Sequence, residues 1–353
     1  MPPGRSIILI PFLLATALAG CASPRMAELD ARLGLAPQAA PPRQPAAAPG
    51  QEAALAGLYQ EGAAALQGND LDAAMSAWRR YAALAPSHLP RTQTVRGYLT
   101  LLERESAKRF AREAVAAERT AGRLKTDRFH VALIPFRNQD PSPEAKAKPF
   151  NRGIQAMVAT DLAQVPSLKV LERARMDYLL REMRLAESGL VDPASAARAG
   201  RMLGAGSLVA GVVSNEADSQ ASPLGNDTGR YAITTAVSDV ESGSLLGTQE
   251  ASGRQYQYFE LEKKIVHGIL DALGVRDIPP AVDRIHTRNW DAYVRFTRGL
   301  RLLEEERFEE ARQAFYAALN FDPEFALAEE AYLNTPRRNL GLEEIKAEVT
   351  SGR

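Results

Sequence analysis

The chain has 353 residues, and its 43 lysines and arginines balance 43 aspartates and glutamates, which argues against a nucleic-acid-binding protein with a basic surface. At roughly 150 residues per domain, this length predicts two domains, or one domain with helical flanks. The single cysteine excludes an intramolecular disulfide and any site built from several cysteines. No metal-ligand spacing relates the four histidines, so we expect surface or capping roles for them, with no metal and no cofactor: His88, His130, His267 and His286.

Residues 1–20 have the features of a cleaved export signal. Arg5 and the α-amino group precede an apolar run that is too short to span a bilayer, since a spanning helix needs about 20 apolar residues. The run ends in four residues that resemble the lipobox of bacterial lipoproteins: Leu18, Ala19, Gly20 and Cys21. This resemblance implies acylation of Cys21 and a membrane anchor, and Ala22 in place of aspartate favours the outer membrane, facing the periplasm. The alternative is a buried free cysteine that acts as a small apolar side chain.

The segment 21–50 is predicted to be a tether between the lipidated cysteine and the folded protein. Between Ala36 and Gly50, 11 of 15 residues are alanine or proline, a composition that favours extended polyproline II structure. At about 3.1 Å per residue, such a stretch could hold a domain up to roughly 45 Å from the membrane.

Two helical segments, residues 51–122 and 287–335, resemble the tetratricopeptide (TPR) repeat. Positions at equal spacing correspond between the two copies: Gly62, Ala74, Trp78 and Pro86 in the first, and Gly299, Ala311, Phe315 and Pro323 in the second. In such a hairpin the glycine lets the second helix approach closely, the aromatic residue fills the groove, and the proline ends the second helix. One repeat cannot bury its apolar face alone, so each copy needs neighbouring helices.

Repeats of this kind bind peptides or partner helices, so we expect envelope proteins or secreted polymer subunits as partners. The predicted partner-binding residues are Tyr59, Tyr293 and Phe296, on the first helix of each copy. The alternative is that these aromatic side chains pack against the flanking helices. The acidic run from Glu304 to Glu310 predicts a solvated turn, and residues 336–353 are predicted to form a flexible tail.

Residues 128–276 predict a mixed sheet with flanking helices, and therefore an α/β domain. Apolar residues at helical spacing predict helices over residues 150–165, 174–185, 193–203 and 258–273. Gly204 and Gly274 mark the ends of two of them. Strands are expected at 129–136, 168–171, 207–213, 231–240 and 244–251, and Gly243 suits the turn of the last hairpin.

Within this domain the segments Val170–Arg173, Leu179–Pro193 and Ala196–Ala205 resemble the family of the curli-assembly component CsgG, as do Val131–Phe136 and Asp239–Leu246. The resemblance implies a periplasmic α/β domain on an outer-membrane lipoprotein, and homo-oligomers are plausible on the same ground. Channel-forming members of the family carry transmembrane β-hairpins, whose strands need about 9–11 residues of alternating apolarity. The polar, breaker-rich residues 214–230 do not have this pattern, so we expect a domain without such hairpins.

The sequence therefore predicts a non-enzymatic, lipid-anchored scaffold for envelope or extracellular-polymer assembly and secretion. Two alternatives remain open at this point. One is a periplasmic lipoprotein that regulates a peptidoglycan synthase, for which the tether is suitable. The other is an enzyme or small-ligand receptor, which would need a cluster of convergent polar groups that no motif in the sequence supplies.

Overall fold

The computed structural model describes residues 24–35, 49–118, 126–139, 150–183, 193–216 and 229–351. The predicted signal peptide and its cleavage and lipidation residues, Leu18, Ala19, Gly20 and Cys21, lie outside these ranges. Across the residues that the structure describes, no helix combines the length and the apolarity needed to cross a bilayer.

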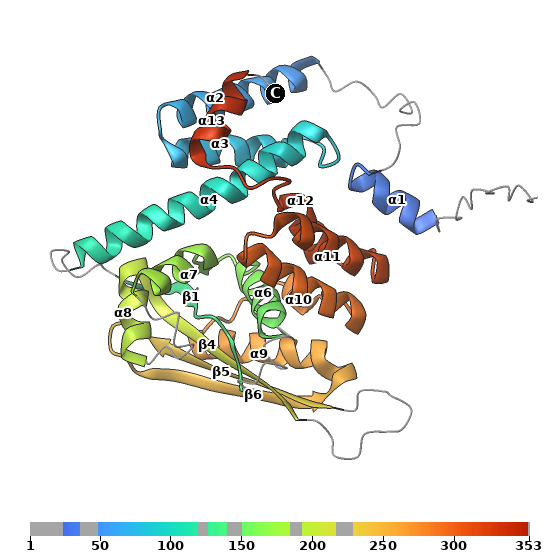
Figure 1. Ribbon diagram of the computed structural model, residues 1–353. Helices are drawn as coiled ribbons and strands as arrows, with labels where there is room; N and C mark the ends of the chain where they lie inside the picture. Colours follow the sequence, from blue (N-terminus) through green and yellow to red (C-terminus); the bar gives the residue numbers. More distant parts are fainter. Residues whose placement is uncertain are drawn as a thin grey trace, which may run out of the picture.

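A mixed sheet lies in the lower half of the molecule (Figure 1). Its strands are β1 (Asp127–Leu133), β2 (Arg137–Asn138), β3 (Lys169–Val170), β4 (Ala205–Glu216), β5 (Arg230–Asp239) and β6 (Leu245–Arg254). The order is β3-β1-β4-β5-β6, with β2 beside β4. β1 runs parallel to β3 and β4, whereas β4, β5 and β6 are antiparallel. This arrangement confirms the predicted α/β class.

Helices cover both faces of the sheet, and α9 (Tyr258–Leu273) lies on its antiparallel strands β5 and β6. The helices α6 (Phe150–Ala163) and α9 pack on one face, and α7 (Arg173–Glu182) and α8 (Pro193–Leu203) pack on the other. Successive residues of β1 alternate between the two interiors, because side chains along a strand point to opposite faces: Val131 and Leu133 face α6 and α9, and Ala132 faces α7 and α8. Each large apolar side chain so buried contributes about 1.5–3 kcal/mol.

The predicted close approach of paired helices is present in both hairpins outside the sheet. These hairpins are α2 (Pro49–Gln67) with α3 (Leu71–Leu84), and α10 (Trp290–Glu304) with α11 (Phe308–Phe321). A Cβ atom added to Gly62 would lie 2.3 Å from Trp78, and one added to Gly299 would lie 2.4 Å from Phe315. The turns also correspond, since Asn69 and Glu306 both have positive φ, at 64° and 61°. The two hairpins are thus built alike, while their assignment as TPR repeats stays a prediction.

The long helix α4 (Pro90–Ala117) connects the parts of the molecule (Figure 1). Its first half packs on α3 and on α12 (Ala326–Asn334), where Thr100 donates a hydrogen bond to the Asn334 carbonyl oxygen at 2.7 Å. Its second half packs on α7 and α8. Two helical segments separated by the whole sheet domain in sequence are therefore in contact through α4.

Two segments differ from the predicted organisation. Within the predicted flexible tail, residues 342–351 form the helix α13 (Leu342–Ser351), whose Ile345 and Val349 are 1% and 8% exposed and pack with α2 and α4. Part of the predicted tether is also helical, since α1 (Pro24–Arg32) packs on the C-terminal helices. Both helices are short, and in each a pair of apolar residues four positions apart provides the buried stripe.

Candidate functional site

The structure places two of the three predicted partner-binding residues in the interior. Tyr293 is 0% exposed and Phe296 is 2% exposed, so a partner-binding role is wrong for both, and the packing alternative holds. The Tyr293 hydroxyl donates to the Phe150 carbonyl oxygen at 2.7 Å and lies 3.1 Å from the Tyr258 hydroxyl. These contacts join α10 to α6 and α9 of the sheet domain.

Tyr59 differs from the other two predicted residues because its ring is only partly buried. It stacks on Trp78 with ring centroids 6.2 Å apart, and the Arg91 guanidinium lies 5.4 Å from its ring centroid. The Trp78 indole N–H also donates to the Tyr59 carbonyl oxygen at 3.2 Å. A partner-binding role for Tyr59 stays a prediction.

Two side chains of the acidic run 304–310 pair with other elements, and the prediction of a solvated turn is wrong for Glu304, whose side chain is only 23% exposed. Glu304 accepts a hydrogen bond from Arg152 of α6 at 2.7 Å and pairs with Arg173 of α7. Glu306 accepts one from Arg104 of α4 at 2.8 Å. The turn therefore links the C-terminal hairpin to the sheet domain and to α4 by charge-assisted hydrogen bonds.

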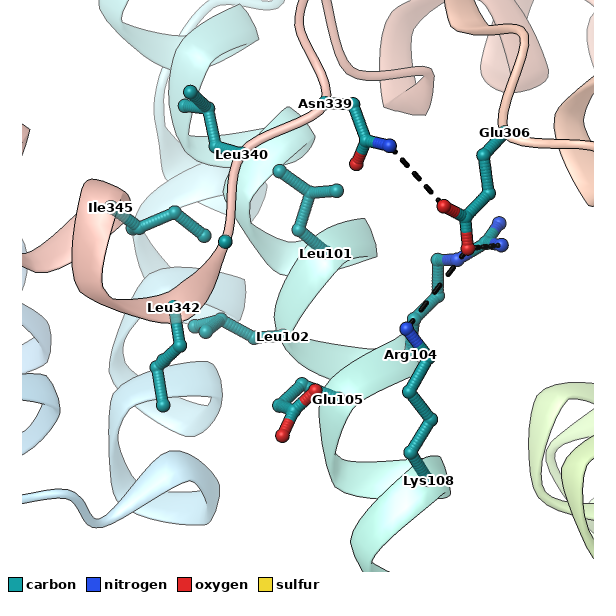
Figure 2. Close-up of a pocket in the computed structure, with 11 residues that line it drawn as sticks. Leu101, Leu102, Arg104, Glu105, Lys108, Glu306, Asn339, Leu340, Leu342 and Ile345 are labelled. Carbon is teal, nitrogen blue, oxygen red and sulfur yellow. Dashed lines mark hydrogen bonds and ion pairs between the residues drawn. The ribbon is translucent and has the colours of Figure 1, made fainter.

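A small pocket of about 130 Å³ opens beside this turn, between α4 and the segment that leads into α13 (Figure 2). Apolar side chains form one wall and charged or amide groups form the other: Leu101, Leu102, Leu340, Leu342 and Ile345, opposite Arg104, Glu105, Lys108, Glu306 and Asn339. Burial tends to raise the pKa of Glu306, but Arg104, Asn339 and Lys108 together outweigh it, so this pKa is lowered. The pocket thus has one apolar wall and one wall of charged and amide groups. It is large enough for one apolar side chain.

A cluster of ionisable groups lies inside the sheet domain, between α6, α9 and the segment before α10. The Lys263 ammonium nitrogen lies 2.5 Å from Asp161 Oδ2 and 3.1 Å from Glu262 Oε2. His286 Nε2 lies 2.9 Å from Asp161 Oδ1. The side chains of Asp161 and Glu262 are each only 1% exposed. A surface or capping role is therefore wrong for His286, whose partner is a buried carboxylate.

Burial and hydrogen bonds shift the two carboxyl groups in opposite directions. Burial, and then repulsion from Asp161, raise the pKa of Glu262 well above its ordinary value, and Lys263 offsets only part of this. Burial also acts to raise the pKa of Asp161, but hydrogen bonds from His286, Glu262 and Lys263 outweigh it and lower that pKa. The two neighbouring carboxyl groups beside the lysine therefore differ in proton affinity, and Glu262 holds its proton to a higher pH than Asp161 does.

Asp161, Glu262 and His286 bring ligand atoms within 4.8 Å of one another, and these are atom types that Zn²⁺ accepts. The Lys263 ammonium, however, already supplies a positive charge to both carboxyl groups. We therefore interpret the group as an ion cluster that holds three elements together. Sequence spacing could not have revealed it, because Asp161 is 102 residues from Lys263 and 125 residues from His286.

Comparison with known proteins gives one result that bears on function. Residues 116–258 match the family model described as "Curli production assembly/transport component CsgG". The match covers the end of α4, the whole sheet and the first residue of α9, and it supports the resemblance found in the sequence. No match was found among curated proteins.

Proposed function

We propose that this chain is a lipid-anchored, non-enzymatic scaffold of the outer membrane that faces the periplasm and serves the assembly or transport of an extracellular polymer. The observation that carries the proposal is the family match over the sheet domain, whose description names an assembly and transport component. The lipobox-like residues that end at Cys21 support the anchor, and the contacts that join the helical segments to the sheet support a rigid scaffold.

Partners bind, in this proposal, to the helical part of the molecule. The pocket beside α4 suits an apolar side chain with a charged neighbour, because leucines form its apolar wall and Arg104, Glu105 and Lys108 lie on the opposite wall. Tyr59 lies on the same N-terminal helical segment. Envelope proteins or secreted polymer subunits are the expected partners, and the proposal includes the formation of homo-oligomers.

Acylation of Cys21 is tested by metabolic labelling with palmitate. We expect the chain to incorporate label and to fractionate with outer membranes, and Cys21→Ser to lose both properties, because only a thiol forms the thioether to the lipid. Retention of label by the Cys21→Ser variant would contradict the anchor.

The partner is tested by photo-crosslinking in native envelopes from a probe at Glu105, at the pocket rim, with a probe at exposed Glu250 on β6 as the matched control. We expect a secreted fibre subunit or adhesin to be captured from Glu105 and not from Glu250. Capture of a peptidoglycan synthase from Glu105 would instead support the alternative that this chain regulates such a synthase.

We also propose that the sheet domain forms no pore of its own. The 3-10 turn Gln255–Gln257 and α9 follow β6 directly, which leaves no room for a hairpin there, and residues 217–228 lie outside the described part of the chain. Purified protein in planar bilayers should show no defined conductance steps. Stable, uniform channels would contradict this part of the proposal.

A further inference from the structure

The helix α1 is held on the C-terminal helices by core packing. Leu29 and Leu33 are fully buried, and they share one apolar cluster with Phe315, Phe325 and Tyr332. Burial of these two leucine side chains favours the docked position of α1. A short helix of nine residues would not be stable alone, so these contacts account for its presence.

Hydrogen bonds fix the orientation of α1 on this surface. They join the Tyr316 hydroxyl to Asp30 (2.8 Å), the Arg32 guanidinium to the Pro323 carbonyl oxygen (2.8 Å) and the Gln93 amide to the Leu33 carbonyl oxygen (2.8 Å). Arg32 also lies 3.4 Å from Glu329. These partners come from α11, α12, the turn between them and α4, so the C-terminal end of α1 is held from several sides.

This placement decides where a lipid on Cys21 must lie. Cys21 is three residues before Pro24, and a chain spans at most about 3.6 Å per residue, so the thioether starts within about 11 Å of the first residue of α1. The alanine- and proline-rich stretch follows α1 and joins it to α2. That stretch therefore does not separate the docked helix from the membrane.

We propose that α1 stays docked in the lipidated protein and holds the α11–α12 side of the molecule against the lipid headgroups, with the sheet domain directed away. This inference rests on the proposed acylation of Cys21. Exposed Phe321 at the end of α11 lies under the Arg295 guanidinium, 3.9 Å from its ring centroid, and Arg32 binds Pro323 two residues further on. An aromatic ring paired with a cation suits the headgroup region of a bilayer.

The test compares two fluorescent labels on full-length lipidated protein in vesicles of phosphatidylethanolamine and phosphatidylglycerol that carry a headgroup-attached quencher. One label is on Glu324→Cys, an exposed position beside Pro323, and the other is on Leu245→Cys, which is 61% exposed at the start of β6. α1 and the start of β6 lie at opposite corners of the molecule (Figure 1). Cys21 does not react with the dye, because its sulfur is already a thioether.

We expect strong quenching of the Glu324→Cys label, weak quenching of the Leu245→Cys label, and loss of this difference when Leu29→Asp and Leu33→Asp are added. Equal quenching of the two labels without the α1 substitutions would overturn the proposal, and this comparison does not require the α1 variant to fold. Mass spectrometry of the N-terminal peptide separates the two hypotheses. An unacylated Cys21 would contradict the proposed lipid anchor. An acylated chain with equal quenching of the two labels would contradict only the proposal that α1 stays docked.

Discussion

Burial and the neighbouring Asp161 raise the pKa of Glu262, which lies beside Lys263 in the interior of the sheet domain. Because its folded pKa is raised, this group stabilises the fold fully at pH values below its unfolded pKa of about 4.5, and the contribution is lost as the pH rises toward the folded pKa. The lowered pKa of Asp161 acts in the opposite sense, and its contribution is lost as the pH falls below about 3.8. The cluster is therefore most stabilising in mildly acidic solution.

We expect Glu262→Gln to remove the alkaline part of this dependence. The glutamine amide can donate to Asp161 as the protonated carboxyl does, but it cannot lose a proton. The wild-type free energy of unfolding should fall relative to the variant by about 1.4 kcal/mol for each pH unit between the unfolded and the folded pKa of Glu262. Urea unfolding from pH 4 to pH 8 measures the difference, with exposed Glu250→Gln as the control. Parallel pH profiles for the wild type and Glu262→Gln would contradict a raised pKa of Glu262 in the folded protein.

Each helical hairpin depends on a glycine that faces an aromatic ring. In Gly299→Ala the new methyl group would lie 2.4 Å from Phe315, so we expect a loss of about 1–3 kcal/mol in the free energy of unfolding from overpacking. Gly57→Ala is the matched control, since nothing lies within 4 Å of its added Cβ and alanine favours the helix by about 0.5–1 kcal/mol. Opposite shifts of the urea midpoint are expected, and a neutral Gly299→Ala would contradict the close helix contact.

At the element scale, local patterns predicted most of the fold. Apolar residues at helical spacing predicted α6 and α9 close to their observed positions. Gly243 and Gly274 have the positive φ values of 69° and 76° that their positions in a turn and at a helix end require. β2 was not predicted, because two residues carry no periodicity. α1 and α13 were also missed, because their stability comes from contacts with distant helices rather than from their own sequences.

The candidate sites were less predictable than the elements, for a related reason. The aromatic periodicity correctly placed Tyr293 and Phe296 on the first helix of the hairpin, but it could not show that this helix face is covered by α6, α9 and the neighbouring helices. Likewise, the partners of Glu304 and Glu306 come from α6, α7 and α4. Short-range patterns identify which residues share a face, and only the tertiary arrangement decides what covers that face.

At the scale of the whole molecule, α13 packs on the N-terminal helices α2 and α4. Its loss should therefore destabilise regions that are far from it in sequence. Ile345 and Val349 pack in the same apolar cluster as Leu66, Trp78 and Leu102 of α2, α3 and α4. The Tyr98 hydroxyl of α4 also donates to Glu348 at 2.6 Å. The last ten-residue helix therefore completes a core that the N-terminal helices cannot complete among themselves.

Ile345→Asp places a charge in this core, and we expect it to destabilise α2, α3 and α4 together by more than about 3 kcal/mol, because a buried unpaired carboxylate is strongly unfavourable. Hydrogen exchange should become faster across these helices and α13, while α6 and α9 keep their protection, since their core is separate. Exposed Ala347→Asp on the same helix is the control and should change stability by less than about 0.5 kcal/mol. If faster exchange were confined to α13, the N-terminal helices would be stable without it, and the inference that α13 completes their core would be wrong.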